Sequence, residues 1–353
     1  MIISTCSFGS TGSSVITDYL KEFGSVKVMD AVELPWISAV DGIVDLEYHL
    51  NNPHSRTSDS IYAIERYKKL CHKKASSFER LGVSPDLFYE SVERFLNEIT
   101  QARWMWKKPD KEYGFFEDLL IRIINKTRVI PKWQVKHGMP WEGYPFEEVC
   151  FSIKPSNFKE AARRHIKELM SAIGANEWEI LAFDQLFPGN NPQCCFGYFD
   201  DPYAIVVDRD PRDLYVFGRT VLVKGAAAHI MPISNVEDFV IYYRALRDNQ
   251  PYKEANARIL ALRFEDLVYR YEDATKTVRD FLGLPENPSP KSIFDPSHSM
   301  ANTQVWKRYP QYQKDIECIE ACLPEYLYDF TGCPVPDSNA RMFSGKSPKN
   351  IVG

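Results

Sequence analysis

The first 29 residues predict a strand, a loop, a helix and a second strand, an order that few folds accommodate. Residues 2–6 form a short strand-like run, and a small polar loop with two glycines follows over residues 7–14. Apolar residues then recur at helical spacing as far as Gly24, where a helix is expected to end. Residues 26–29 predict a second strand. A strand, a glycine loop, a helix and a strand in this order are half of a parallel nucleotide-binding unit.

The rest of the chain repeats the alternation. Strands are predicted at residues 179–183, 204–207 and 259–262, and each is followed by a helix-like stretch. Strands that alternate with helices over the whole length predict an α/β fold with a central parallel sheet and helices on both faces.

A helical insertion interrupts this pattern over residues of about 45–175. Helices are predicted over residues 58–74, from Pro85 after the capping Ser84, over 113–125 and over 157–173. We expect the insertion to pack over the sheet edge and not to form a separate domain. A last helix is predicted over 312–330, and residues 336–353 are expected to be a tail.

Composition excludes several classes of protein. With 353 residues, 44% of them hydrophobic and 26% charged, the chain is neither disordered nor fibrous. A net charge of −5 argues against a nucleic-acid partner, and the absence of an apolar run of about 18 residues argues against a membrane span. The eight cysteines lack zinc-site spacing. Because no leader pattern precedes the first strand, we expect free thiols and a cytoplasmic location.

The glycine loop is a candidate anion site. Backbone amides of such a loop and of the following helix point outward, and loop hydroxyls would add donors. The expected binding residues are Ser10, Thr11, Gly12, Ser13 and Ser14. No lysine follows Gly12, which disfavours ordinary ATP or GTP hydrolysis, and no GxGxxG pattern is present. A purely structural strand-to-helix turn is the alternative.

A second signal is an arginine at the end of the strand over residues 204–207. Asp210 and Pro211 then predict a helix start, so that Arg209 stands at the carboxyl end of a parallel strand. Ligands of open α/β sheets bind at this edge, and a guanidinium can hold a phosphate with two parallel hydrogen bonds. Arg212 is a further candidate for the same anion. The alternative is a surface network of arginines and aspartates.

Two later segments are less specific. Glu265 and Asp266 begin a predicted helix, where the helix dipole accounts for acidic residues, and we interpret them as structural. Residues 299–308 are polar and basic, and end in Trp306, Lys307 and Arg308. This stretch could surround an anion or be an ordinary solvated loop.

Together these elements resemble the sulfotransferases that use 3′-phosphoadenosine-5′-phosphosulfate (PAPS). The family's loop for the 5′-phosphosulfate corresponds to residues 10–14, its strand for the 3′-phosphate to residues 209–213, and its later strand-helix element to residues 263–267. In that family a C-terminal loop closes over the nucleotide, and residues 299–308 correspond to this loop. The resemblance implies a P-loop-like three-layer sandwich, formed by a single domain over residues 1–335. It also implies PAPS as donor, 3′,5′-adenosine bisphosphate (PAP) as product and no required metal.

The sequence departs from the family at two positions. Ser10 stands where the family has a loop lysine or arginine, a cation that supports charge on the leaving-group oxygen. Four other cations are candidates for this role: Lys307, Arg308, Arg56 and Lys136. Phe217 stands where the family has a serine for the 3′-phosphate, and Arg219 is a candidate replacement.

The resemblance implies in-line sulfuryl transfer to a hydroxyl group, with a general base that takes its proton. In carbohydrate-acting relatives this base is a carboxylate beyond the second strand, where Glu33 falls, with Asp30 as second choice. Other relatives use a histidine in a region that here contains Asp184 and Gln185, which would line the site as an alternative base and a donor to the sulfuryl oxygens. His54 and His137 are the remaining histidine candidates.

Several functions remain open at this stage. A carbohydrate or glycan precursor is the favoured acceptor by the position of Glu33, and a lipid, a sterol or a small alcohol is the alternative. Aromatic and basic residues of the insertion, including Trp104, Trp106, Trp133 and Trp141, suit either kind of acceptor. A P-loop kinase or hydrolase and an inactive nucleotide-binding protein are the rival classes. The oligomeric state is left open.

Overall fold

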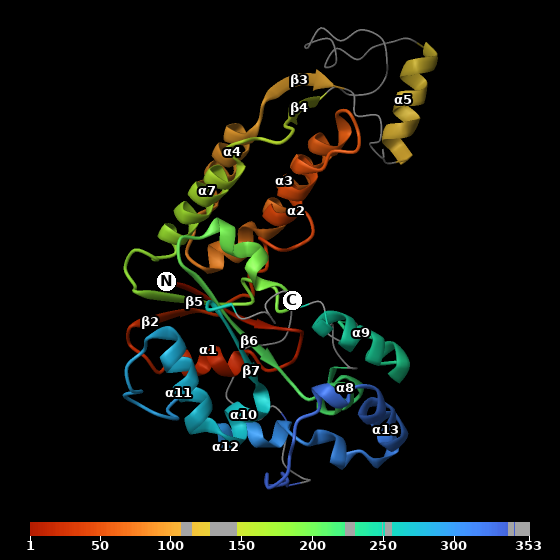
Figure 1. Ribbon diagram of the computed structural model, residues 1–353. Coiled ribbons are helices and arrows are strands. Elements are labelled where there is room, and N and C mark those ends of the chain that lie inside the picture. Colours follow the sequence, from red (N-terminus) through yellow and green to blue (C-terminus); the bar gives the residue numbers. More distant parts are fainter. Residues whose placement is uncertain are drawn as a thin grey trace. The chain divides into compact units, whose positions relative to one another are not determined.

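The computed structural model describes residues 1–106, 115–127, 147–222, 230–248, 250, 256–337 and 342. These residues belong to two compact units (Figure 1). The sheet unit consists of Met1–Ser38, Glu79–Val83 and Met170–Gly353, and the helical unit consists of Ala39–Phe78 and Ser84–Leu169. That the insertion packs over the sheet edge within a single domain stays a prediction.

A five-stranded parallel sheet forms the centre of the sheet unit. Its strands are β1 (Ile2–Ser7), β2 (Val26–Met29), β5 (Ile180–Asp184), β6 (Pro202–Asp208) and β7 (Ile259–Arg263). Their order across the sheet is β2-β5-β1-β6-β7, so that the first strand lies in the middle. The predicted fold class, an α/β fold with a central parallel sheet flanked by helices, is confirmed, as are all five predicted strands.

One face of the sheet carries the larger core. Side chains alternate between the two faces of a strand, so Ile3, Ile205 and Val207 lie on the same face. They pack with apolar side chains of three helices, namely α1 (Ser14–Leu20), α10 (Phe264–Tyr269) and α11 (Tyr271–Leu282). Figure 1 shows where these helices lie along the sheet. The 3-10 helix η1 (Pro192–Tyr198) and the segment before it lie against the other face, where the Phe187 amide donates to Ser4 Oγ at 2.9 Å.

A second core joins the helices that follow the sheet. Apolar residues of α8 (Pro211–Thr220), α9 (Val236–Asp248) and α13 (Gln313–Cys322) form it together. Short turns connect this core to the end of α11: α12 (Pro296–Ser299), η5 (Met300–Asn302), η6 (Val305–Arg308) and η7 (Pro310–Tyr312). The predicted final helix over 312–330 is wrong at its end, because α13 ends at Cys322. Pro324 disfavours helical geometry at Leu323, and only η8 (Pro324–Tyr326) follows.

The helical unit contains most of the predicted insertion. Its helices are α2 (Ile43–Asn51), α3 (Ser58–Arg80), α4 (Pro85–Ile99), α5 (Phe115–Thr127) and α7 (Phe158–Ala172). The predicted cap of α4 is confirmed, because Ser84 Oγ accepts the Leu87 amide at 3.3 Å. An antiparallel pair, β3 (Ala102–Trp106) and β4 (Glu147–Phe151), was not predicted. In the described part of the chain, no helix is long and apolar enough to cross a membrane.

A buried histidine network lies inside the helical unit. The side chain of His165 is only 2% exposed, with Nδ1 at 2.8 Å from Ser91 Oγ and Nε2 at 3.2 Å from the Tyr67 hydroxyl. The Phe95 ring stacks on the imidazole, with ring centroids 5.3 Å apart. Burial lowers the pKa of His165 to about 3, so the ring is neutral at physiological pH.

Candidate functional site

The candidate site lies at the carboxyl edge of the sheet. Parallel strands end at the same edge, which is where open α/β sheets bind their ligands. The glycine loop follows β1, Gln185 follows β5 and Arg209 follows β6. Glu33 lies in the loop after β2. Local strand and loop patterns therefore bring most of the predicted site residues to one edge.

The glycine loop adopts a backbone that constrains its sequence. Gly9, Ser10 and Gly12 have φ angles of 86°, 57° and 96°, in the left-handed region. A Cβ atom on Gly12 would lie 2.5 Å from a ring carbon of Phe264, so only glycine fits there. The buried hydroxyl of Thr11 donates to the Val207 carbonyl at 2.6 Å. Thr11 therefore fastens the loop to β6, and the predicted use of its hydroxyl as a ligand donor has no support in this geometry.

Gln185 holds the loop from the neighbouring strand. Its side-chain nitrogen donates to Ser7 Oγ at 2.7 Å and to Ser13 Oγ at 2.8 Å, and its side-chain oxygen accepts the Ser7 amide at 3.2 Å. Both amide hydrogens are thus used within the loop, which makes Gln185 a support for the loop instead of a donor to substrate.

The loop presents unpaired amides. Among the residues that the structure describes, no protein acceptor takes a hydrogen bond from the amides of residues 10–14. Ser14 is exposed at the first position of α1. Amides that are grouped in this way are suited to an anion.

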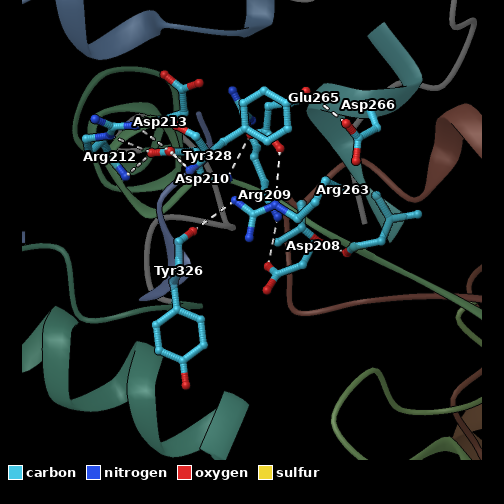
Figure 2. Close-up of polar contacts among 12 residues, drawn as sticks. Asp208, Arg209, Asp210, Arg212, Asp213, Arg263, Glu265, Asp266, Tyr326 and Tyr328 are labelled. Atoms are coloured by element: carbon cyan, nitrogen blue, oxygen red, sulfur yellow. Dashed lines mark hydrogen bonds and ion pairs between the residues drawn. The ribbon is translucent and has the colours of Figure 1, made fainter. Parts of the chain in front are cut away.

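Arg209 provides a buried positive charge beside this loop. Figure 2 shows Arg209 among the charged residues near it. Its side chain is 2% exposed and lies between the rings of Phe217 and Phe264, with Cζ at 5.4 Å and 5.3 Å from their centroids. Its hydrogen bonds go to the carbonyls of Ser10, at 3.5 Å, and Asn302. Its Nε has no hydrogen-bond partner, and no described carboxylate forms an ion pair with it. The guanidinium therefore keeps capacity for an anion.

Arg212, the second arginine predicted to bind the anion, is bound by protein groups instead. Its guanidinium binds Asp210 with two hydrogen bonds, at 3.0 Å and 2.8 Å, and Glu320 at 2.8 Å. Its Nη2 also donates to the Tyr328 carbonyl at 3.1 Å (Figure 2). Asp210 in turn caps α8 by accepting the Arg212 amide at 2.9 Å. Arg212 thus joins α8 to α13 and the segment after it, and its donors are occupied by protein.

Asp213 performs a role that the sequence did not indicate. Its carboxylate is fully buried and accepts the amides of residues 304–306. These bonds fix the C-terminal loop that also carries the Asn302 carbonyl. Burial raises the pKa of Asp213 to about 7, against the lowering effect of Arg209.

Glu265 is the other buried carboxylate of this cluster. Its Oε1 accepts the Asp210 amide at 2.8 Å, and its Oε2 lies 3.5 Å from Arg263 Nε. Burial raises the pKa of Glu265 to about 7, and the charge of Arg263 opposes the shift. The structural interpretation of this glutamate holds, but its partner is the start of α8 and not only its own helix.

The candidate replacement cations are distributed over different regions. Lys307 is exposed, and its Nζ donates to Gln304 Oε1 at 2.6 Å. Arg308 is half-buried beside it on η6. Arg56 is exposed in the helical unit, and Lys136 lies outside the described residues. Arg219 donates to the carbonyls of residues 233 and 234.

The candidate bases also differ in their surroundings. Glu33 is exposed, and the amide of the next residue, Leu34, donates to the Asp184 carbonyl at 3.3 Å. Asp30 forms an ion pair with Lys21 at 2.7 Å. Asp184 is buried, with Oδ1 at 3.4 Å from the Thr5 hydroxyl. Glu33 is therefore the exposed carboxylate of this set, and the backbone of the residue after it is bonded to the end of β5.

Neither predicted histidine is among the described residues of the sheet unit. His54 lies in the helical unit, exposed, with Nε2 at 3.0 Å from Asp59. His137 lies outside the described residues, as do Trp133 and Trp141.

Comparison with known proteins gives only distant likenesses. No family model and no curated protein matches the chain. Among solved structures, the sulfotransferase domain of the Synechococcus PCC 7002 olefin synthase is similar at 11% identity and a TM-score of 0.37, over 84% of this chain and 76% of that one. The sulfotransferase domain from the curacin biosynthetic pathway is similar at 11% identity and a TM-score of 0.35, over 82% and 75%. At this identity neither domain's activity can be assigned to the chain. A function is therefore inferred from the residues of the site itself.

Proposed function

We propose that this protein is a sulfotransferase that moves a sulfuryl group from PAPS to a hydroxyl group of an acceptor. The observation that carries the proposal is the pairing of Arg209 with the glycine loop. A buried guanidinium with an unpartnered Nε lies next to a loop whose amides of residues 10–14 have no described acceptor. Two anion sites on neighbouring strands suit a donor with phosphates at both its 3′ and 5′ positions.

In this proposal the two sites divide the donor between them. The amides of residues 10–14 and the exposed Ser14 hydroxyl bind the 5′-phosphosulfate, and Arg209 binds the 3′-phosphate. Phe217 fills the place of a second hydrogen-bond donor and stacks on Arg209, so the arginine alone reads the 3′-phosphate. The absence of a lysine after Gly12 separates this site from a magnesium-dependent phosphoryl-transfer site.

The reaction then needs an oriented acceptor and a base. The acceptor oxygen forms a bond to sulfur while the bond from sulfur to the donor phosphate oxygen breaks in line. Glu33 takes the proton from the acceptor hydroxyl, because it is the exposed carboxylate of the loop after β2. Asp184 is the alternative base, on the adjacent strand β5.

The leaving group needs a positive charge that Ser10 does not supply. We assign this role to Lys307, whose Nζ donates to the neutral amide oxygen of Gln304 and lies 5.3 Å from the centroid of the Trp306 ring. The loop that carries Lys307 is fixed to α8 by Asp213 and to Arg209 by the Asn302 carbonyl. A lysine on this loop can exchange a neutral partner for a phosphate oxygen at little cost.

The acceptor class follows from the base. A carboxylate beyond the second strand, as Glu33 is, resembles the arrangement in carbohydrate-acting sulfotransferases, so a sugar hydroxyl is the first candidate. A lipid, a sterol or a small alcohol is the alternative, since the aromatic residues of β3, Trp104 and Trp106, suit either class.

The proposal is tested by following PAP release from PAPS with a panel of sugar, phenol and aliphatic alcohol acceptors. The expected result is acceptor-dependent release that excess EDTA leaves unchanged. Release that depends on magnesium would indicate a phosphoryl-transfer enzyme. Tight PAP binding without release for any acceptor, even in a single-turnover experiment, would indicate an inactive nucleotide-binding protein.

A further inference from the structure

The helix α9 contacts both halves of the proposed donor site. Tyr243 and Arg247 lie four residues apart on it, and side chains at this spacing share a helix face. Both are almost completely buried, at 0% and 1% exposure. Neither residue was a candidate on sequence grounds.

The first contact fixes the backbone on the carboxyl side of Arg209. The Tyr243 hydroxyl donates to the Arg209 carbonyl at 2.9 Å. Burial raises the pKa of Tyr243 well above its ordinary value, so the hydroxyl keeps its proton and remains a donor.

The second contact fixes the other side of the same residue. Arg247 binds Asp208 with two hydrogen bonds, Nε to Oδ2 at 2.9 Å and Nη2 to Oδ1 at 2.6 Å. Asp208 Oδ1 also accepts the amide of Arg209 at 2.8 Å. One face of α9 therefore holds the carbonyl of Arg209 directly and its amide through Asp208.

A third contact reaches the glycine loop. The Arg247 guanidinium lies 4.1 Å from the centroid of the Phe8 ring and 3.5 Å from that of the Tyr243 ring. Phe8 belongs to the loop, and its amide donates to Thr11 Oγ1 at 3.3 Å. The same guanidinium thus contacts the loop and, through Asp208, the backbone of Arg209.

The ion pair between Arg247 and Asp208 is largely withdrawn from water, with side-chain exposures of 1% and 18%, and such a pair is a costly way to stabilise a core. Apolar residues of similar volume are often as stable or more so, because the two charges must leave water. Beyond packing, the Arg247–Asp208 pair orients the Asp208 carboxylate, because a two-point contact fixes its direction. This carboxylate accepts the Arg209 amide.

We propose that Tyr243 and Arg247 are positioning residues that hold Arg209 and the glycine loop at the spacing the nucleotide needs. The inference rests on the proposed function for its ligand, but its structural part concerns the protein alone. Its prediction is that loss of either contact loosens the end of β6 and the glycine loop together and weakens reading of the 3′-phosphate.

The first experiment measures amide hydrogen exchange in the nucleotide-free protein for Tyr243→Phe and Arg247→Met. We expect exchange about 2- to 10-fold faster, the reach of one net hydrogen bond, in peptides covering residues 8–14 and 207–211. Peptides from α4 should not change. The matched control is Tyr215→Phe, which removes another buried tyrosine hydroxyl of the sheet unit whose partner is Asp315. Uniform acceleration, or none at the two segments, overturns the inference.

The second experiment measures the preference for PAP over AMP. Tyr243→Phe should lower this preference several-fold, and Tyr215→Phe should leave it unchanged. In an Arg209→Ala background, Tyr243→Phe should cause no further loss, since residues that act through one group are not additive. An additive loss, or an equal loss of affinity for both nucleotides, contradicts positioning.

The two experiments separate the inference from the proposed function. If the wild-type protein binds neither nucleotide, the proposed function fails, while the exchange data still decide whether α9 orders these two segments. If PAP binds and the variants leave its preference unchanged, the inference fails and the proposed function stands.

Discussion

The two units bury polar side chains in opposite ways. In the helical unit, His165 is neutral and both its ring nitrogens have hydroxyl partners, on Ser91 and Tyr67. In the sheet unit, Arg209 is buried with an unpartnered Nε, and Glu265 Oε2 has only a 3.5 Å ion pair with Arg263 Nε and no hydrogen-bond partner among the described residues. Buried polar atoms are nearly always paired, so those left over call for an explanation. Residual hydrogen-bonding capacity, and not burial, distinguishes the candidate site from a structural network.

The difference also separates two kinds of role inside the sheet unit. Arg212 and Gln185 have their donors occupied by protein groups, as His165 does. Arg209 and the amides of residues 10–14 do not. The comparison therefore assigns a supporting role to Arg212 and Gln185, and ligand binding to Arg209 and the loop amides. The sequence alone had indicated ligand binding for all of them.

The largest effect is expected from Glu33→Gln. Loss of a general base should lower turnover by ~10²–10⁴-fold, while PAP affinity should stay the same because Glu33 makes no contact with the glycine loop or Arg209 in the proposal. Steady-state rates with saturating PAPS measure the first, and calorimetry measures the second.

The matched control is Asp30→Asn, in the same loop region. Asp30 is paired with Lys21, so its substitution should leave turnover close to that of the wild type. If Asp30→Asn abolished turnover and Glu33→Gln did not, the base would be Asp30 and the assignment would be wrong.

Arg209→Ala should have the next largest effect. We expect a loss of about 2–5 kcal/mol in affinity for PAP, by analogy with truncation of one partner of a buried charge pair, and little loss for AMP. Calorimetric titration of the variant with both nucleotides measures the difference.

Arg219→Ala removes another arginine side chain, from the helix α8 that begins just after Arg209, and serves as control. Arg219 bonds to the carbonyls of residues 233 and 234, so PAP affinity should not change. Equal losses for PAP and AMP in Arg209→Ala would show that Arg209 does not read the 3′-phosphate.

Lowering the pH should change the stability contributed by the two buried clusters in opposite directions. The folded-state pKa of His165 is lowered to about 3, so the unfolded chain binds a proton that the folded chain refuses as pH falls below 6.5. The contribution of the neutral His165 to the stability of the helical unit is therefore complete above pH 6.5. The free energy of unfolding should fall by about 2 kcal/mol between pH 7 and pH 5. Hydrogen exchange of α4 and α7 measures this loss, and His165→Gln should remove it.

The sheet unit carries the reverse linkage. The pKa values of Asp213 and Glu265 are raised by burial to about 7, so the folded state binds their protons more tightly than the unfolded chain does. Their contribution to stability should increase as pH falls from about 7 towards their ordinary values, and exchange of α8 should slow accordingly. Parallel acid destabilisation of α4 and α8 would contradict the contrast between the two buried clusters.

The smallest effect is expected from Gly12→Ala. The left-handed backbone costs about 1–2 kcal/mol for a residue with a Cβ, and contact with the Phe264 ring adds to it. Urea unfolding should detect the loss. Gly24→Ala is the control, because a Cβ there meets nothing within 4 Å, and it should cost no stability. Equal stability of the two variants would mean that the loop does not need its present backbone.

Local patterns were enough to predict the five strands of the parallel sheet, the glycine loop and the position of Arg209. Each depends on residues close together in the chain, where side-chain periodicity and turn residues act directly. The β3–β4 pair was missed because its partner strands are separated by a long segment and its aromatic and basic residues suggested an acceptor surface instead. The end of α13 was missed because the amphipathic pattern was followed past Pro324.

The supporting contacts of the site were out of reach for a different reason. Asp213 binds amides about ninety residues later, and Tyr243 and Arg247 contact Arg209 and Asp208 from a separate helix. Nothing in the local pattern of these residues distinguishes them from ordinary helix positions. Arg212 shows the converse, because a motif that suggested a ligand contact is used within the protein.

The most direct test of the central claim is calorimetric titration with PAP, beside AMP and ATP–magnesium. If Arg209 and the glycine loop form a site for two separated phosphates, PAP should bind at least tenfold more tightly than AMP, a difference of about 1.4 kcal/mol. ATP–magnesium should bind no better than AMP. Failure of PAP to bind, or a preference for ATP–magnesium, would contradict the assignment of a PAPS site and with it the proposed sulfotransferase activity.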